Sequence, residues 1–258
     1  GDDWRGALLR DRMQSAGVRA ETALVEPGRF TPFYGKVVLT APHLQQEDAR
    51  LDFINTAPLR TEVEEALINQ LERLLPDLDA LVIADYQAFG VVTGRVLHAL
   101  NELAQRFPRV VFAVDSRERI GAFHGMILNP NEMEAFRAVF PGRDPDTCND
   151  VDLHHAGHKL QAAAGQPVYL TLGERGCLLF DREGEYHLPA ASTGGPIDPV
   201  GAGDTFIAAL AAGLAAGATP WEAGALASLA AGVTLRKLHI TGTASPQEIL
   251  ALSESLWP

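Results

Sequence analysis

The chain lacks several features that would place it in large classes of protein. Its 258 residues include two cysteines, Cys148 and Cys177, which form no metal-ligand pattern and fit a reducing compartment. The longest apolar run, residues 206–218, is too short and too rich in Ala and Gly to span a bilayer. No basic segment followed by an apolar segment opens the chain, so no secretory signal is expected. We therefore expect a cytoplasmic protein without a membrane partner.

Positive charge is also scarce. The chain has 21 Lys and Arg residues against 33 Asp and Glu residues, a formal net charge of −12, which argues against nucleic acid as a partner. A phosphate-binding site would then be built locally, from backbone N–H groups and a metal. No Gly-x-x-x-x-Gly-Lys-Ser/Thr P-loop occurs, and Phe206 stands where a dinucleotide fingerprint has its third glycine. Apolar residues make up 47% of the chain, enough for a full core.

One stretch carries most of the chemical signal. Gly201-Ala202-Gly203-Asp204 leads into an Ala-rich helix predicted over residues 205–216. The first N–H groups of a helix have no partner within it, and the helix dipole attracts an anion there. Glycine lets a ligand approach the backbone, and the Asp204 carboxylate can accept a proton from a hydroxyl group. An anion hole beside a base suits phosphoryl transfer to an alcohol. The alternative is that Asp204 only caps the helix.

From Thr61 onward, helical and strand patterns alternate. We predict strands over 81–84, 109–114, 125–128, 168–172, 177–180 and 185–188, and helices over 61–75, 91–107, 150–164, 205–216, 220–238 and 246–256. Before them we predict a helix over 5–14 and strands over 33–40 and 50–54, with a polar loop between the two strands. Alternation predicts a mostly parallel sheet with helices on both faces and a ligand at the carboxyl ends of its strands. Polar residues at four strand ends should converge near Gly201–Asp204: Asp85, Asp115, Asn129 with Glu132, and Thr171 with Gly173.

The run Asp198-Pro199-Val200-Gly201-Ala202-Gly203-Asp204-Thr205-Phe206 resembles the second signature of the ribokinase-like (PfkB) carbohydrate kinase family. The resemblance implies an α/β fold, a three-layer sandwich with a mostly parallel central sheet and a small β lid. It implies one kinase domain over residues 1–258, with the lid strands within about 30–57. The implied reaction is ATP-dependent phosphoryl transfer to a hydroxyl of a sugar or sugar phosphate. Asp204 would be the base, and the N–H groups of Gly201, Ala202 and Gly203 would stabilise the transferring group.

Further motifs extend the resemblance to the nucleotide and metal sites. Asn129-Pro130-Asn131-Glu132 resembles the family's Asn-x-x-Glu motif, whose Glu orients a magnesium-bound water; alone, Glu132 would only complement a helix dipole. The turn with Thr171, Gly173 and Gly176 resembles the family's Thr-x-Gly-x-x-Gly segment beside the nucleotide, or is a simple β-turn. The small-residue helix over 223–232, which includes Ala231, and the loop over 239–245, which includes Thr243, would form a wall for adenine. The alternative is that the small residues serve helix packing.

The remaining candidate residues are fewer. Asp198 and the carbonyl of Val200 match the family's monovalent-cation site, which takes K⁺. Asp85 and Arg117 are candidate substrate contacts; Arg117 would hold a phosphate on the substrate or be solvated. His154 and His158 share one helix face, but no third ligand follows at a useful spacing, so we interpret them as surface residues.

The resemblance covers nearly the whole chain and is closest to the heptose-phosphate kinase-like branch, in which the acceptor is a phosphorylated sugar. The residues that favour this branch are Asp85-Tyr86, Gln45-Gln46 and Thr241–Ser245. The lid would pair with that of a second subunit in a homodimer. The family's first strand, with a sugar-binding Asp, and its Gly-Gly-x-x-x-Asn segment have no counterpart here. We therefore expect a domain that is N-terminally incomplete, by truncation or by loss. The alternatives are a nucleoside or vitamin-precursor kinase of the same fold, or a catalytically impaired nucleotide-binding protein.

Overall fold

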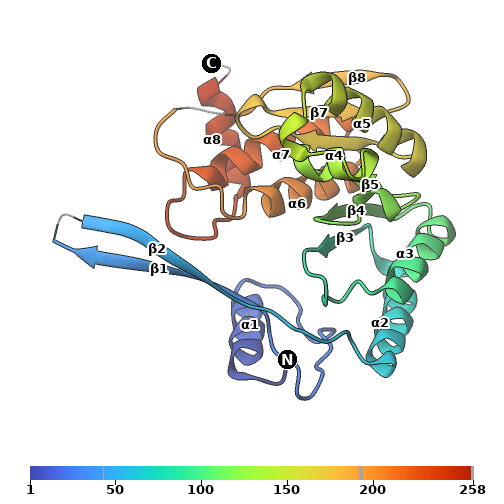
Figure 1. The fold of residues 1–258 in the computed structure, drawn as a ribbon, viewed down its shortest axis with the longest axis vertical. Helices are drawn as coiled ribbons and strands as arrows, with labels where there is room; N and C mark the ends of the chain where they lie inside the picture. Colours follow the sequence, from blue (N-terminus) through green and yellow to red (C-terminus); the bar gives the residue numbers. More distant parts are fainter. Residues whose placement is uncertain (43, 192–193, 257–258) are drawn as a thin grey trace. The chain divides into compact units, whose positions relative to one another are not determined.

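The computed structural model describes residues 1–42, 44–191 and 194–256 (Figure 1). It divides into two compact units, and we describe each by itself. The first unit comprises Gly1–Arg73 and Gln87–Leu97, and the second comprises Leu74–Tyr86 and the chain from His98 onward. The predicted organisation as one kinase domain stays a prediction. Within the described ranges, no helix combines the length and apolar character needed to cross a membrane.

The first unit is built on a helix and a β-hairpin. Helix α1, Trp4–Ser15, begins at Asp3, whose carboxylate accepts the N–H groups of Gly6 at 2.8 Å and Thr31 at 2.9 Å. Strands β1, Phe33–Ala41, and β2, Leu44–Phe53, pair antiparallel, with Phe33 opposite Phe53. The unit also contains most of helix α2, Thr61–Leu74.

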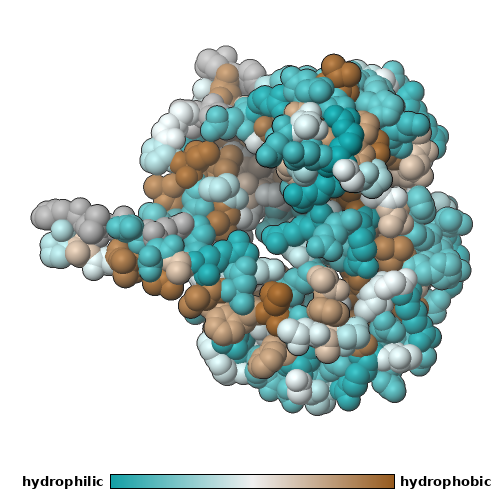
Figure 2. Space-filling model, in the orientation of Figure 1, coloured by the Kyte–Doolittle hydropathy of each residue, from teal (hydrophilic) through white to brown (hydrophobic). Residues whose placement is uncertain are grey.

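The hairpin corrects the prediction of a polar loop between two short strands. That prediction was wrong, because β2 begins at Leu44 and pairs with β1 along its length. Polar residues can line a two-stranded ribbon, since both of its faces meet water. The hairpin also carries exposed apolar side chains along its length, among them Val38, Leu39 and Leu51 (Figure 2).

The second unit contains a six-stranded sheet in the order β3-β4-β5-β6-β7-β8. The first four strands are parallel and the last two are antiparallel. Their bounds are β3 Ala80–Asp85, β4 Val111–Ser116, β5 Ile127–Leu128, β6 Val168–Thr171, β7 Cys177–Phe180 and β8 Glu185–Leu188. The middle strands are apolar runs that are buried on both faces, as parallel sheets require.

Helices cover both faces of this sheet. Helices α4, Glu132–Val139, and α5, Asp150–Ala164, lie on one face, and α6, Ala202–Ala215, and α7, Pro220–Leu235, lie on the other (Figure 1). Helix α8, Pro246–Leu256, packs on α7, and α3, Gly94–Arg106, precedes β4. Tyr169, Leu179 and Phe206 belong to the core between the sheet and α6 and α7. The predicted α/β three-layer sandwich is confirmed.

Candidate active site

The Gly-Ala-Gly-Asp turn forms the start of α6. Gly201 is the N-cap residue at φ 80°, and a Cβ there would lie 2.9 Å from Cγ2 of Thr241, so glycine is required. The helix begins at Ala202, three residues before the predicted start. The first N–H group with an acceptor inside the helix is that of Thr205, which donates to Gly201 at 2.9 Å.

In the first turn of α6, the N–H groups of Gly203 and Asp204 are better placed to bind an anion than the N–H group of Ala202. Ala202 donates its N–H to the Pro199 carbonyl at 3.2 Å, so this predicted anion-hole donor is engaged within the turn. The N–H groups of Gly203 and Asp204 lie in the first turn of α6, where a helix supplies no acceptor. At Gly203, a Cβ would lie 3.9 Å from Oδ2 of Asp115, which places this turn beside β4.

Tyr86 connects Asp204 to the sheet. Its hydroxyl lies 2.7 Å from Oδ1 of Asp204 and 3.0 Å from Oδ2 of Asp115. Tyr86 directly follows β3, and Asp115 lies in the neighbouring strand β4. The guanidinium of Arg117 lies over the Tyr86 ring, 5.4 Å from its centroid. The predicted convergence of the β3 and β4 ends on Asp204 is therefore present, and Tyr86 mediates it.

Negative charge is concentrated at these strand ends. Burial, with repulsion from Glu134 and Asp204, raises the pKa of Asp115 to about 7, against the opposing effects of the Tyr86 hydrogen bond and Arg117. Burial also raises the pKa of Glu134, although hydrogen bonds from Asn131 and the charge of Arg117 oppose this. Carboxyl groups in this condition favour the approach of a cation. Across the described residues, no group of three or more His, Cys, Asp or Glu side chains is arranged to hold a metal ion by itself.

Two glutamates in the first turn of α4, Glu132 and Glu134, have different partners. Glu132, the predicted magnesium residue, pairs with Arg175, which also bonds Asp150 at 2.6 Å. Glu134 instead forms a capping box with Asn131: its carboxylate accepts the Asn131 N–H at 2.8 Å, and its own N–H donates to the Asn131 side chain at 3.0 Å. Residues 131–134 repeat the Asn-x-x-Glu spacing two residues after the predicted motif. Sequence analysis missed Glu134, and this second occurrence was the available signal.

The other residues of the predicted nucleotide site tie β5 to β6. Asn129 is buried, and its side-chain amide donates to the Tyr169 carbonyl at 3.0 Å, which is a structural contact. Thr171 donates its N–H to the Pro130 carbonyl at 2.9 Å. Gly173 and Gly176 have φ values of 58° and 90°, and a Cβ on Gly176 would lie 2.1 Å from the Leu188 carbonyl oxygen. The turn therefore needs glycine for its own conformation, and its contact with a nucleotide stays a prediction.

The two predicted substrate contacts differ in exposure. The Asp85 side chain is 3% exposed and receives hydrogen bonds from Arg119 at 2.7 and 3.1 Å and from Ser116 at 2.7 Å. These bonds give Asp85 a structural role, which the sequence did not indicate. Arg117 is exposed and lies beside the carboxyl groups described above. A substrate contact of either residue stays a prediction.

The remaining predicted residues lie near the α6–α7 end of the second unit. Asp198 accepts the N–H groups of Val200 at 3.1 Å and His239 at 3.0 Å, so its carboxylate shapes the turn before α6. Ala231 lies on α7 and packs against the core. Thr243 is exposed, and its carbonyl accepts a hydrogen bond from Lys237. Their predicted roles toward potassium and adenine stay predictions.

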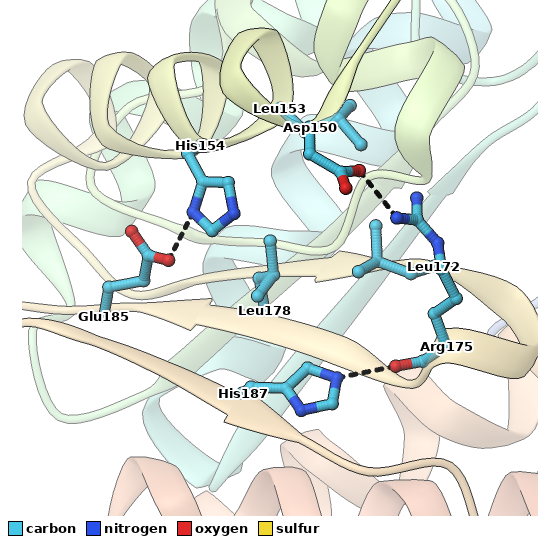
Figure 3. Close-up of a pocket in the computed structure, with 8 residues that line it drawn as sticks. All are labelled: Asp150, Leu153, His154, Leu172, Arg175, Leu178, Glu185 and His187. Atoms are coloured by element: carbon cyan, nitrogen blue, oxygen red, sulfur yellow. Dashed lines mark hydrogen bonds and ion pairs between the residues drawn. The ribbon is translucent and has the colours of Figure 1, made fainter.

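A pocket of about 280 Å³ lies between α5 and the strands β7 and β8 (Figure 3). His154, from α5, points toward Glu185 and pairs with it (Figure 3). His158, on the same helix, also pairs with Glu185, at 3.1 Å. Arg175 enters the same pocket from the glycine turn and reaches Asp150. Both histidines thus have a carboxylate partner on the protein surface.

The sandwich and the Gly-Ala-Gly-Asp helix start define a sugar-kinase type of fold, and the comparisons identify the family. Residues 1–247 match the pfkB family of carbohydrate kinases, and the chain belongs to this family. It is 36% identical over 248 residues to the bifunctional protein HldE of Nitrobacter winogradskyi, covering 95% of this chain and 48% of that protein. For HldE of Trichlorobacter lovleyi the identity is 32% over 255 residues, covering 97% and 50%.

The chain therefore spans about half the length of the curated relatives it matches. These relatives confirm the predicted resemblance to the heptose-phosphate kinase-like branch. Among solved structures, ribokinase of Giardia lamblia aligns with a TM-score of 0.72 and 17% identity, covering 99% of this chain and 81% of that one. Arabidopsis thaliana ribokinase complexed with ribose and ATP aligns with a TM-score of 0.70 and 17% identity, covering 98% and 79%. These alignments confirm the ribokinase-like fold.

Proposed function

We propose that this domain transfers the terminal phosphoryl group of ATP to a hydroxyl of a sugar phosphate, with Asp204 as the base. The observation that carries the proposal is the position of Asp204. Asp204 lies in the first turn of α6, beside backbone N–H groups that lack an intrahelical acceptor. The Tyr86 hydroxyl donates a hydrogen bond to Oδ1 of the Asp204 carboxylate at 2.7 Å. Membership of the pfkB family supports the carbohydrate kinase class.

In the proposed reaction, the acceptor's hydroxyl gives its proton to Asp204 as its oxygen forms a bond to the phosphorus. The bond between that phosphorus and the leaving ADP oxygen breaks. The N–H groups of Gly203 and Asp204 stabilise negative charge on the transferring group. Such transfers depend mainly on positioning and electrostatic stabilisation.

Magnesium would supply charge neutralisation at the phosphates, and it typically binds few protein carboxylates and several waters. The residues fit such an ion, because the raised pKa values of Asp115 and Glu134 reflect crowded, partly buried carboxyl groups. We propose that Glu134 rather than Glu132 would hold Mg²⁺ through water. Glu132 is paired with Arg175, whereas Glu134 interacts electrostatically with Asp115 and Arg117. The K⁺ role of Asp198 and Val200 remains part of the proposal.

The acceptor class rests on two observations. The sequence resembles the heptose-phosphate kinase-like branch, for which the resemblance implies a phosphorylated sugar as acceptor, and the relatives are HldE proteins. The exposed guanidinium of Arg117 lies over the Tyr86 ring and offers a phosphate ligand. The test is an ADP-release assay with Mg-ATP and a panel of sugars, sugar phosphates and nucleosides. A sugar phosphate should be the best acceptor. A nucleoside as best acceptor would favour the nucleoside kinase alternative. ATP-dependent thermal stabilisation without transfer to any acceptor would favour the impaired nucleotide-binding protein.

We also propose a cytoplasmic homodimer that pairs through the β1–β2 hairpin. The exposed apolar side chains of the hairpin, such as Leu39 and Leu51, support a partner there. Sedimentation should give a dimer for the natural chain and a monomer for Leu39→Lys. A monomeric natural chain would contradict this part of the proposal.

A further inference from the structure

The Tyr86 hydroxyl lies between two carboxyl groups, although it can donate only one hydrogen bond. Its oxygen is 2.7 Å from Oδ1 of Asp204 and 3.0 Å from Oδ2 of Asp115. The shorter distance marks Asp204 as the favoured acceptor. Protonated Asp115 can in turn donate to Tyr86, which leaves the phenolic hydrogen for Asp204.

Tyr86 is itself held from several sides. The preceding residue, Asp85, is anchored by Arg119 and Ser116, and its carbonyl accepts the Arg117 N–H at 3.2 Å. The guanidinium of Arg117 lies over the phenol ring. The buried Asp85 ion pair therefore fixes the backbone from which Tyr86 reaches Asp204. This gives the Asp85–Arg119 pair a purpose in the site without contact to a substrate.

Asp204 needs such support because it is exposed on the first turn of a helix. An exposed Asp side chain exchanges between rotamers unless a partner holds it. A base must lie within hydrogen-bond reach of the proton that it takes. Burial and the two neighbouring carboxylates raise the pKa of Tyr86 well above its usual value of 10, so the hydroxyl keeps its hydrogen at any working pH.

We propose that Tyr86 is a positioning residue for the base: its hydroxyl holds Oδ1 of Asp204 and leaves the second carboxylate oxygen aimed at the acceptor's hydroxyl. This inference rests on the phosphoryl transfer proposed above. It assigns a role to a side chain that neither donates nor accepts a proton in the reaction. Tyr86 acts through Asp204, and its removal affects the chemical step more than it affects binding.

The direct test compares Tyr86→Phe with Tyr169→Phe. Both substitutions remove a hydroxyl that makes a hydrogen bond, since the Tyr169 hydroxyl donates to the Pro220 carbonyl at 2.8 Å. Tyr86→Phe should lower kcat about ten- to a hundredfold, with KM for ATP within about twofold of the natural value. Tyr169→Phe should keep the natural kcat. A Tyr86→Phe kcat equal to that of Tyr169→Phe would overturn the inference, and so would a higher kcat, which would mark the contact as inhibitory.

A double variant shows whether Tyr86 acts through Asp204. Tyr86→Phe combined with Asp204→Asn should turn over at the rate of Asp204→Asn alone, because there is no longer a base to position. If adding Tyr86→Phe to Asp204→Asn lowers kcat by the same factor as it does in the natural chain, Tyr86 does not act through Asp204. An inactive natural chain would instead sink the proposed reaction. In that case, urea unfolding of the natural chain, Tyr86→Phe, Asp204→Asn and the double variant still tests the contact. If the shifts of the unfolding midpoint in the two single variants simply add in the double variant, Tyr86 and Asp204 are not coupled.

Discussion

The raised pKa of Asp115 gives the protein a pH-dependent stability that one amide substitution should remove. In the folded protein this pKa is about 7, against an ordinary value of 3.8. The folded state therefore holds a proton on Asp115 in a range where the unfolded chain has released it. Stabilisation from this group is fully present below pH 3.8 and is lost as the pH rises through 7.

The size of the effect follows from the two pKa values. Each pH unit between them changes the free energy of unfolding by about 1.36 kcal/mol. Asp115 alone should therefore lower the free energy of unfolding by roughly 3 kcal/mol between pH 5 and pH 8. Asp115→Asn imitates the protonated acid at every pH. The variant should match the natural chain only below pH 3.8, the ordinary pKa of the group. Its advantage in stability should then grow by roughly 3 kcal/mol between pH 5 and pH 8.

The assay is urea unfolding at a series of pH values, in EDTA so that no divalent cation occupies the carboxylates. Asp77→Asn is the matched control, because Asp77 is exposed in the same unit and the substitution also replaces one carboxyl group by an amide. Parallel curves for Asp115→Asn and the natural chain would refute the electrostatic account of the site.

Two further substitutions test how the site is supported, both by unfolding midpoints. Gly201→Ala should cost more stability than Gly142→Ala, because both positions have φ near 80° but only residue 201 would meet Thr241; equal losses would contradict that contact. Arg119→Ala should cost about 3–5 kcal/mol by leaving the buried Asp85 charge unpaired. Adding Asp85→Asn should recover part of that loss, and a further loss would contradict the ion-pair account.

Much of the second unit could be predicted from local patterns. Helix α5 spans 150–164 as predicted, because Asn149 caps it and Gly165 ends it in the left-handed conformation. Strands β7, 177–180, and β8, 185–188, also have their predicted bounds. A buried apolar run and the turn residues between the strands mark them locally. The polar start of β2 was missed because its partner β1, rather than its own composition, makes it a strand.

The site was harder to predict, because it depends on which side of an element a residue faces. Glu132 and Glu134 lie two residues apart on one helix, about 200° apart around its axis. Only the packed structure shows that Glu134 acts electrostatically on Asp115, whereas Glu132 pairs with Arg175. Asp85 and Tyr86 are neighbours at the end of a strand, where side chains alternate in direction. Sequence analysis selected Asp85 for the substrate, whereas Tyr86 is the residue that reaches Asp204.

The most direct test of the account is a single-turnover measurement with the best acceptor, comparing the natural chain with Asp204→Asn. Excess enzyme, Mg-ATP labelled in the terminal phosphate and acceptor are mixed, and phosphorylated acceptor is counted while nucleotide binding is titrated separately. We predict that Asp204→Asn slows transfer at least about a hundredfold and binds the nucleotide with nearly natural affinity. Transfer by Asp204→Asn at the natural rate would show that Asp204 is not the base.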